Sequence, residues 1–285
     1  MLSRFVCENC GFWQKRFTTP LTCPVCEDFR HPLPPDGYAF ATPEEVDARQ
    51  TVSWDEPLPG VTRFSTMPSI GIGSCGYLVE TPAGNIHFDG CGWYDDAALD
   101  HVEGRGGVAF LAASHAHVYG ALWRVAERFK PKVVFQAEEL PFCQAFPVSF
   151  PFDEAWELCS GFTLHRTAGH TPGHTILHDA ANRRLYCGDA LKFTFPPSSD
   201  GNKSGQTVGE PDTVSTHLAF DAHIPVTHAT ARRYRDLFAA LDFDAVVTPW
   251  EVVTSGGKDA ALTLLDHQLA GEPSADPFPI PDAHA

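Results

Sequence analysis

The sequence has no long run of apolar residues. None approaches the roughly 20 consecutive residues that a helix needs to cross a bilayer, so we expect no transmembrane segment. Residues 1–10 also lack the apolar stretch that follows the basic residues of a secretory signal. Together these absences predict a cytoplasmic protein.

Basic residues are also scarce. The chain has 20 Lys and Arg against 36 Asp and Glu, a formal net charge of −16. Nucleic acids are held mainly by Lys and Arg on their phosphates, and acidic lipid surfaces repel an acidic protein. The densest basic stretch, residues 124–132, is typical of a solvated helix end. We therefore expect neither a nucleic-acid partner nor a membrane partner.

The composition is otherwise that of a globular protein. Hydrophobic residues make up 43% and charged residues 20% of the 285 residues, enough for one large core with a small appendage. Of the nine cysteines, four lie in two Cys-x-x-Cys pairs and five are scattered among apolar neighbours. In a chain without a secretory signal, this pattern favours metal thiolates and reduced buried thiols over disulfides.

The first 41 residues carry the paired cysteines, Cys7, Cys10, Cys23 and Cys26. Each Cys-x-x-Cys can form a tight turn whose backbone amides point at the sulfurs, and two such turns supply a tetrahedral set of four thiolates. A segment this small cannot fold by burial alone, so a bound metal would provide the folding free energy. Residues 1–41 are therefore predicted to be a small metal-binding module.

This module resembles zinc ribbons, and resembles rubredoxin-like modules even more closely. The first knuckle reads Cys10-Gly11-Phe12 and the second Cys23-Pro24-Val25-Cys26. Rubredoxin-like modules bind iron and transfer electrons, whereas ribbons bind structural zinc. Glu27 stands where the rubredoxin pattern usually has glycine, which favours zinc and leaves iron as the alternative.

Residues 42–270 alternate between short β-rich apolar runs and stretches with helical spacing, which predicts a second, larger α/β domain. The following tail, 271–285, is dense in Pro and Asp and is expected to be disordered. The predicted strands are 76–80, 85–88, 108–113, 132–136, 184–187 and 245–248, and the predicted helices lie within 120–130 and 234–241.

Three motifs in this second part carry candidate ligands. Each ligand comes just beyond an apolar run, at the end of a predicted strand, where sites assemble in α/β folds. Three imidazoles and a carboxylate suit one zinc or ferrous ion. The motifs are Ser114-His115-Ala116-His117-Val118-Tyr119-Gly120, Gly169-His170-Thr171-Pro172-Gly173-His174 and Cys187-Gly188-Asp189-Ala190.

These motifs resemble those of the metallo-β-lactamase superfamily, from about residue 62 to residue 251. The resemblance implies an αββα sandwich and, in most members, hydrolase activity. It implies that His115, His117 and His170 hold the first metal, with Asp189 as the carboxylate that bridges two metals in dinuclear members. Asp89 matches an aspartate that supports the site from behind its ligands.

The second metal position of that superfamily is incomplete here. Its Asp and His are replaced by Tyr119 and Gly120, and its last histidine by a segment that ends in Glu251. We therefore expect one metal at this position. His174 is expected to form hydrogen bonds within the site rather than ligate. Whether further side chains join the site is left open; they are Glu251, His217, His223 and His228.

We expect a mononuclear zinc hydrolase that acts on a small molecule. Zinc lowers the pKa of a bound water from about 16 to about 7, and Asp189 would hold the resulting nucleophile. By position, Tyr119 is the expected catalytic electrophile in place of a second cation. One alternative is a non-haem iron oxygenase similar to persulfide dioxygenases, with His115, His170 and Asp189 as its ligands. The other is a non-catalytic binding protein, and a homo-oligomer is possible in each case.

Overall fold

A computed structural model describes residues 2–28, 30, 33–196, 207–220 and 222–280. The chain divides into two compact units, Met1–Asp153 (unit 1) and Glu154–Ala285 (unit 2). This division falls inside the segment 42–270 that we predicted as one domain. The boundary predicted between residues 41 and 42 remains a prediction.

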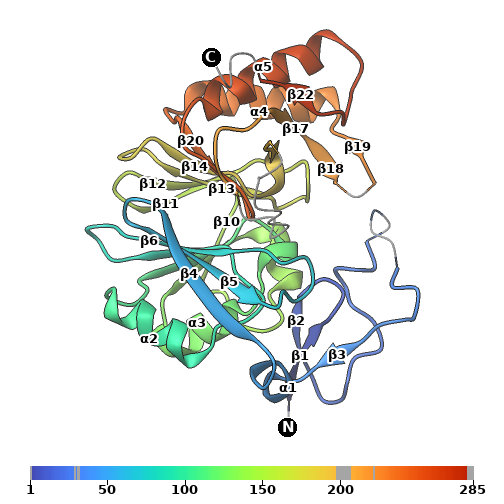
Figure 1. The fold of residues 1–285 in the computed structure, drawn as a ribbon, viewed down its shortest axis with the longest axis vertical. Helices are drawn as coiled ribbons and strands as arrows, with labels where there is room; N and C mark the ends of the chain where they lie inside the picture. Colours follow the sequence, from blue (N-terminus) through green and yellow to red (C-terminus); the bar gives the residue numbers. More distant parts are fainter. Residues whose placement is uncertain (1, 29, 31–32, 197–206, 221, 281–285) are drawn as a thin grey trace. The chain divides into compact units, whose positions relative to one another are not determined.

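Unit 1 contains a small sheet and a large one (Figure 1). The small sheet has the order β2-β1-β3, from β1 (Ser3–Cys7), β2 (Trp13–Arg16) and β3 (Phe40–Ala41). The large sheet has the order β10-β9-β8-β7-β6-β5-β4. Its strands are β4 (Thr51–Leu58), β5 (Val61–Met67), β6 (Gly76–Val79), β7 (Ile86–Phe88), β8 (Phe110–Ala112), β9 (Lys132–Gln136) and β10 (Phe150–Phe152).

Strands β4 to β7 are antiparallel, whereas β7 to β10 run parallel. The carboxyl ends of β7 and β8 therefore meet at one edge, because parallel neighbours end on the same side. The helical elements of this unit are α1 (Pro43–Asp47), α2 (Asp96–Gly104), η1 (Ala116–Val118), α3 (Leu122–Phe129) and η2 (Ala137–Phe142).

One hydrophobic core serves both sheets of unit 1. Buried residues of the cysteine module (Val6, Phe12, Trp13) belong to the same cluster as Leu111 of β8 and Leu122 of α3. The module is thus packed into the unit rather than tethered beside it.

Unit 2 is built on a sheet of order β11-β12-β13-β14-β20-β21-β16, with two smaller sheets, β15-β17-β22 and β18-β19. Helices α4 and α5 pack against each other, and α5 also packs on β17 and β20. The elements are β11 (Ala155–Cys159), β12 (Phe162–Arg166), β13 (Thr175–Asp179), β14 (Arg184–Tyr186), η3 (Gly188–Ala190), β15 (Lys192–Thr194), β16 (Val208–Gly209), β17 (Thr213–Ser215), β18 (His217–Ala219), β19 (Ile224–Pro225), α4 (His228–Ala240), β20 (Ala245–Val247), β21 (Val252–Val253), α5 (Gly257–Ala270) and β22 (Phe278–Pro279).

The mixed α/β architecture confirms the predicted class. The structure differs from the expectation of a disordered tail, because Phe278–Pro279 pairs with β17 and the Phe278 ring lies 4.7 Å from that of His267. The last part of the predicted tail, 281–285, lies outside the described residues. Among the described residues, no helix is long and apolar enough to span a membrane.

Candidate metal centres

The four cysteines of unit 1 are buried and lie together. Their sulfurs fall within 4.8 Å of one another, with Cys7 Sγ 3.8 Å from Cys26 Sγ and Cys10 Sγ 3.6 Å from Cys23 Sγ. A tetrahedral ion with metal–sulfur bonds of about 2.3 Å places its sulfurs about 3.8 Å apart, whereas a disulfide needs about 2.05 Å. The cluster therefore fits a tetrahedral metal site, and its geometry suits zinc and iron alike.

Short-range backbone contacts shape this cluster. Strand β1 ends at Cys7, and Gly11 takes φ 85°, a left-handed conformation that glycine adopts without strain. The Gly11 amide donates to the Cys7 carbonyl at 2.8 Å, and the Asn9 side chain donates to Cys26 Sγ at 3.3 Å. These turns aim the sulfurs inward, as the Cys-x-x-Cys spacing predicts.

His115 and His117 form the second group in unit 1. They follow β8 and lie on either side of the start of η1, with ring centroids 4.8 Å apart. His115 is fully buried and His117 is half-buried. We call these two residues the histidine pair.

Asp89, directly after β7, holds the residue that precedes the pair. Its Oδ1 accepts from the Ser114 amide at 2.6 Å and from the Ser114 hydroxyl at 2.9 Å. The hydroxyl has one proton and gives it to the carboxylate, so Ser114 Oγ accepts from His115 Nδ1 at 3.0 Å. The Nε2 lone pair of His115 is then the one offered to a metal.

Glu139 was not found by sequence reasoning. It is 2% exposed, and its Oε2 accepts from the Ala116 amide and from the Tyr119 hydroxyl, both at 3.0 Å. Because a backbone amide and a side chain 20 or more residues away converge on it only after folding, nothing local in the sequence marks this carboxylate.

Tyr119 lies in the core of unit 1. Its ring packs against Phe135 and Phe146 at centroid distances of 5.1 and 6.0 Å. Burial, and then the charge of Glu139, raise the pKa of its hydroxyl well above the usual value. A hydroxyl that already donates to a carboxylate has no second proton for a developing oxyanion, so this placement opposes the electrophilic role that we predicted.

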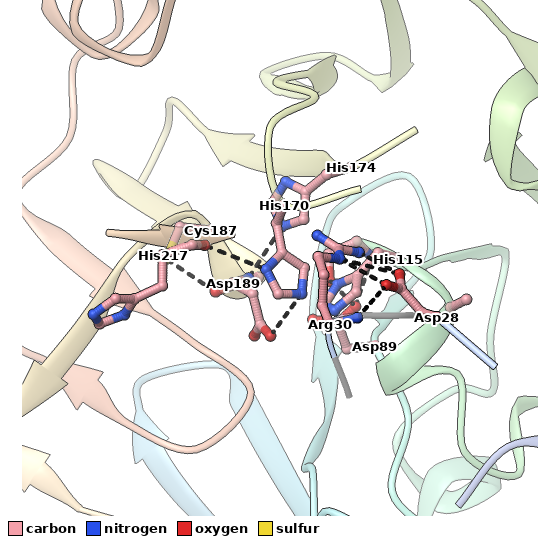
Figure 2. A network of polar contacts seen from close by, with 12 residues as sticks. Asp28, Arg30, Asp89, His115, His170, His174, Cys187, Asp189 and His217 are labelled. Carbon is pink, nitrogen blue, oxygen red and sulfur yellow. Dashed lines mark hydrogen bonds and ion pairs between the residues drawn. The ribbon is translucent and has the colours of Figure 1, made fainter. Parts of the chain in front are cut away.

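In unit 2, His170 and Asp189 lie against each other (Figure 2). Both are almost fully buried, and His170 Nε2 is 3.4 Å from Asp189 Oδ2. Bonds of 2.0–2.2 Å to a tetrahedral zinc separate a nitrogen and an oxygen ligand by about 3.4 Å. The His170 Nδ1 proton is donated to the His217 carbonyl at 3.4 Å, which leaves Nε2 as the ligand atom.

His174 also carries its proton on Nδ1, but its Nε2 lone pair is already used within the protein. The Asp189 amide donates to its Nε2 at 3.0 Å, and its Nδ1 lies 2.6 Å from the Thr167 hydroxyl. Its Nε2 lone pair is therefore used to hold the backbone of Asp189. That His174 supports the site in this way without binding a metal remains a prediction.

The sequence does not decide whether three histidines and Glu251 join the metal site. Each of them has a contact with another part of unit 2. His217 Nε2 contacts the Ala275 carbonyl, and His228 Nε2 contacts the Gly271 carbonyl at 2.9 Å. His223 packs against His217, with ring centroids 5.7 Å apart. Glu251 accepts from the Thr248 hydroxyl, and burial raises the pKa of its carboxyl to about 7.

Lys192, at the start of β15, lies among aromatic rings of unit 2. Its Nζ is 5.0 Å from the ring centroid of Phe220 and 5.4 Å from that of Trp250. Phe220 also stacks on His170 at 5.7 Å. The Lys192 charge lowers, and the Asp189 charge raises, the pKa of Glu251, so both groups act on the same carboxyl. Sequence reasoning had not selected Lys192.

Figure 2 also labels Asp28 and Arg30 of the cysteine module. The Arg30 guanidinium contacts both oxygens of Asp28, through Nε at 2.9 Å and Nη2 at 2.6 Å. Sequence reasoning did not single out this ion pair either.

The fold is shared with solved structures of low sequence identity. VMB-1 superposes with a TM-score of 0.52 at 16% identity, over 77% of this chain and 95% of that one. A metallo-β-lactamase from Erythrobacter litoralis gives 0.50 at 17% identity, over 76% and 92%. The chain has the metallo-β-lactamase fold. A flavodiiron protein from Giardia intestinalis shares this fold, with a TM-score of 0.53 at 11% identity over 77% of this chain and 59% of that one.

Sequence comparison adds one relative. The uncharacterized protein YmaE of Bacillus subtilis (strain 168) is 25% identical over 180 residues, which are 61% of this chain and 65% of that protein. No family model matches the chain. The metallo-β-lactamase fold is therefore established by structure, and with it the predicted resemblance of the larger segment.

Proposed function

We propose that this protein is a metal-dependent hydrolase with one catalytic zinc, held by His115, His117, His170 and Asp189, and that it acts on a small molecule. The observation that carries the proposal is the protonation pattern of two histidines. His115 and His170 each direct Nδ1 to an oxygen of the protein, so each offers Nε2 as a ligand.

The donor set fits this metal. Imidazole nitrogen and carboxylate oxygen are both zinc donors, and the His170–Asp189 separation equals that of two ligands on one ion, so a water would be the fifth ligand. When bound, zinc supplies hydroxide at neutral pH by lowering the pKa of a water ligand to about 7. Burial of His115, His170 and Asp189 favours this chemistry because it limits competing water.

The protein's own groups supply the remaining steps. Asp189, whose backbone is held by His174, orients the nucleophile through its carboxylate. A positive group must stabilise the oxyanion or leaving group where dinuclear enzymes use a second cation. We assign this part to Lys192, because its ammonium shares Phe220 with His170 and acts on the same carboxyl, Glu251, as Asp189.

Removal and return of zinc tests the proposal. The protein should lose activity toward a panel of esters, thioesters, lactones, amides and isothiocyanates when chelated, and regain it with zinc. His170→Ala should remove both the activity and one equivalent of zinc. His165→Ala, a half-buried histidine on β12 of the same unit, is the matched control and should retain both. Fully metallated protein that hydrolyses nothing in the panel would defeat the proposal.

An iron oxygenase is the second candidate, since His115, His170 and Asp189 also suit ferrous iron and the cysteine cluster fits iron as well as zinc. Metal analysis and the visible absorption spectrum separate the two. Colourless protein with zinc in both sites removes this candidate, whereas iron with O₂-dependent turnover supports it.

A further inference from the structure

The cysteine cluster is connected to the histidine pair through buried contacts within unit 1. Trp13 follows the first knuckle, is 1% exposed, and stacks on Trp93 with ring centroids 5.5 Å apart. Its indole Nε1 donates to the Gly92 carbonyl at 3.1 Å. Gly92 belongs to the segment that follows β7 and Asp89, so the module is hydrogen-bonded to the loop behind the histidines.

A second contact joins the knuckle itself to this loop. A Cβ atom on Gly71 would lie 2.1 Å from the carbonyl carbon of Cys10, and one on Gly92 would lie 2.9 Å from Ile70 Cβ. Residues 70–71 are thus packed between the Cys10 knuckle and Gly92. A displacement of the knuckle must move residues 70–71, and these in turn press on Gly92, because close-packed interiors transmit strain.

The loop 89–92 is in turn fastened to residues 114–121, which carry His115 and His117. Glycines permit the close approach, since a Cβ on Gly90 or Gly120 would lie 2.3 or 2.0 Å from a carbonyl oxygen of the other segment. The hydrogen bonds are Ser114 N to Asp89 Oδ1 at 2.6 Å, Gly90 N to Val118 O at 2.7 Å and Ala121 N to Cys91 O at 2.9 Å.

We propose that the cysteine site is a structural metal site that positions the histidine pair, with Trp13 as its positioning residue. A zinc ion, which the sulfur spacing fits, fixes the knuckles. The knuckles hold Trp13 and residues 70–71 against the loop 89–92, and this loop holds residues 114–121. The role of the histidine pair as ligands rests on the proposed function, whereas the mechanical connection does not.

Hydrogen exchange of the Ser114 and Ala121 amides tests the connection in the full-length zinc protein. Trp13→Phe keeps the aromatic packing and removes the bond to Gly92, so both amides should exchange roughly two- to tenfold faster, the range set by one net hydrogen bond. Trp123→Phe is the matched control. Trp123 packs on Trp13 and Trp93 at 5.5 and 5.9 Å, and within the described residues its Nε1 has no hydrogen-bond partner. It should leave both amides near the wild-type rate.

Two further variants act on the other links. Gly71→Ala should separate the knuckle from the loop and speed the same amides while the cysteine metal remains bound. Cys26→Ser should weaken the cysteine site, speed these amides, and raise the zinc dissociation constant of the histidine site, measured against a chromophoric chelator. If Cys26→Ser does not fold, the exchange rates of Trp13→Phe and Gly71→Ala test the connection on their own.

Unchanged exchange in Trp13→Phe and Gly71→Ala, or an equal rise in Trp123→Phe, would overturn the connection. The exchange readout does not need metal at the histidines. If the variants exchange faster but the histidine site binds no zinc, the connection stands and the proposed function is rejected. If the histidine site binds zinc tightly but exchange is unaltered in the variants, the connection is rejected and the proposed function stands.

Discussion

At the scale of single residues, Tyr119, which the motif resemblance aligns with a metal-binding carboxylate, has a structural partner. Tyr119 donates to Glu139, and Glu139 also accepts from the amide of Ala116 at the start of η1. The pair thus braces the turn between His115 and His117. The motif gives the position of Tyr119 in the sequence, but it does not show that the Tyr119 hydroxyl points to Glu139.

Tyr119→Phe tests this role. Because the hydroxyl donates to the Glu139 carboxylate, we expect little change in kcat and a loss of about 1.5–3 kcal/mol in the free energy of unfolding, the usual contribution of a hydrogen bond to a charged group. Steady-state kinetics and denaturant unfolding measure the two effects. A fall in kcat of about 100-fold with the fold intact would instead restore Tyr119 as the electrophile.

We propose Lys192 for the electrophilic role instead. Lys192→Met keeps the length of the side chain and removes its charge, so kcat should fall by about 100-fold, as when one oxyanion-stabilising group is lost. Lys192→Arg should retain part of the activity. Lys258→Met is the matched control, because Lys258 Nζ also lies over a ring of unit 2, Phe243 at 5.7 Å. Equal losses in the Lys192 and Lys258 variants would contradict the assignment.

The candidate metal ligands could be predicted from the sequence, whereas the residues around them could not. His115, His117, His170 and Asp189 stand in short motifs after apolar strands, so their residue types and spacing are visible. Glu139 and Lys192 act through contacts that exist only once the chain has folded. Their own neighbours in the sequence carry no pattern that indicates a partner.

At the scale of elements, the loops at the ends of β7 and β8 carry the support of the histidine pair. Asp89 adopts φ 54°, a left-handed conformation that Asp and Asn tolerate better than other side chains. From there its carboxylate reaches both the amide and the hydroxyl of Ser114. The tautomer of His115 therefore depends on the conformation of the neighbouring loop.

Two substitutions at Asp89 separate its geometry from its charge. Asp89→Ala removes the acceptor and should raise the zinc dissociation constant of the histidine site 10- to 100-fold, the usual effect of losing a group that orients a ligand. Asp89→Asn keeps an acceptor oxygen and the backbone conformation and should cost less. Chelator competition measures both, and equal affinities in the wild type and Asp89→Ala would refute this support.

Most buried central elements were predictable and the outer ones were not. Strand β9 (Lys132–Gln136) has the predicted bounds, and β6, β7, β8, β14 and β20 lie within the predicted ranges. The antiparallel β4–β5 hairpin was missed. Exposed polar residues dominate β4, while β5 buries Thr62, Arg63, Ser65 and Thr66, so neither shows an apolar run or a clean alternation. The buried polar side chains of β5 find their partners only in the folded chain, as Arg63 does with Asp55 and Thr66 with Trp93.

At the scale of the whole molecule, a buried histidine links stability to pH. His87 in β7 is fully buried, with its ring against those of Phe64 and Tyr94. Burial lowers its pKa from 6.5 to about 3. Between these values the unfolded chain binds more protons than the folded one, so stability falls as pH decreases below 6.5.

His87→Leu tests this linkage. From pH 6.5 to pH 5 the wild type should lose about 1.6 kcal/mol through this residue, since the loss per pH unit rises from about 0.7 kcal/mol at pH 6.5 towards about 1.4 kcal/mol. The leucine variant, which cannot titrate, should lose correspondingly less. Urea unfolding at both pH values measures the difference, and equal losses in the two proteins would show that His87 does not remain neutral in the fold.

The central claim is one structural and one catalytic metal per chain, so metal content tests it most directly. Elemental analysis of the full-length protein, purified without added metal and then saturated with zinc, should give two zinc ions per chain. Cys26→Ser and His170→Ala should each lose about one. Three ions per chain in the wild type, with two remaining in Cys26→Ser, would establish a dinuclear site and contradict the account.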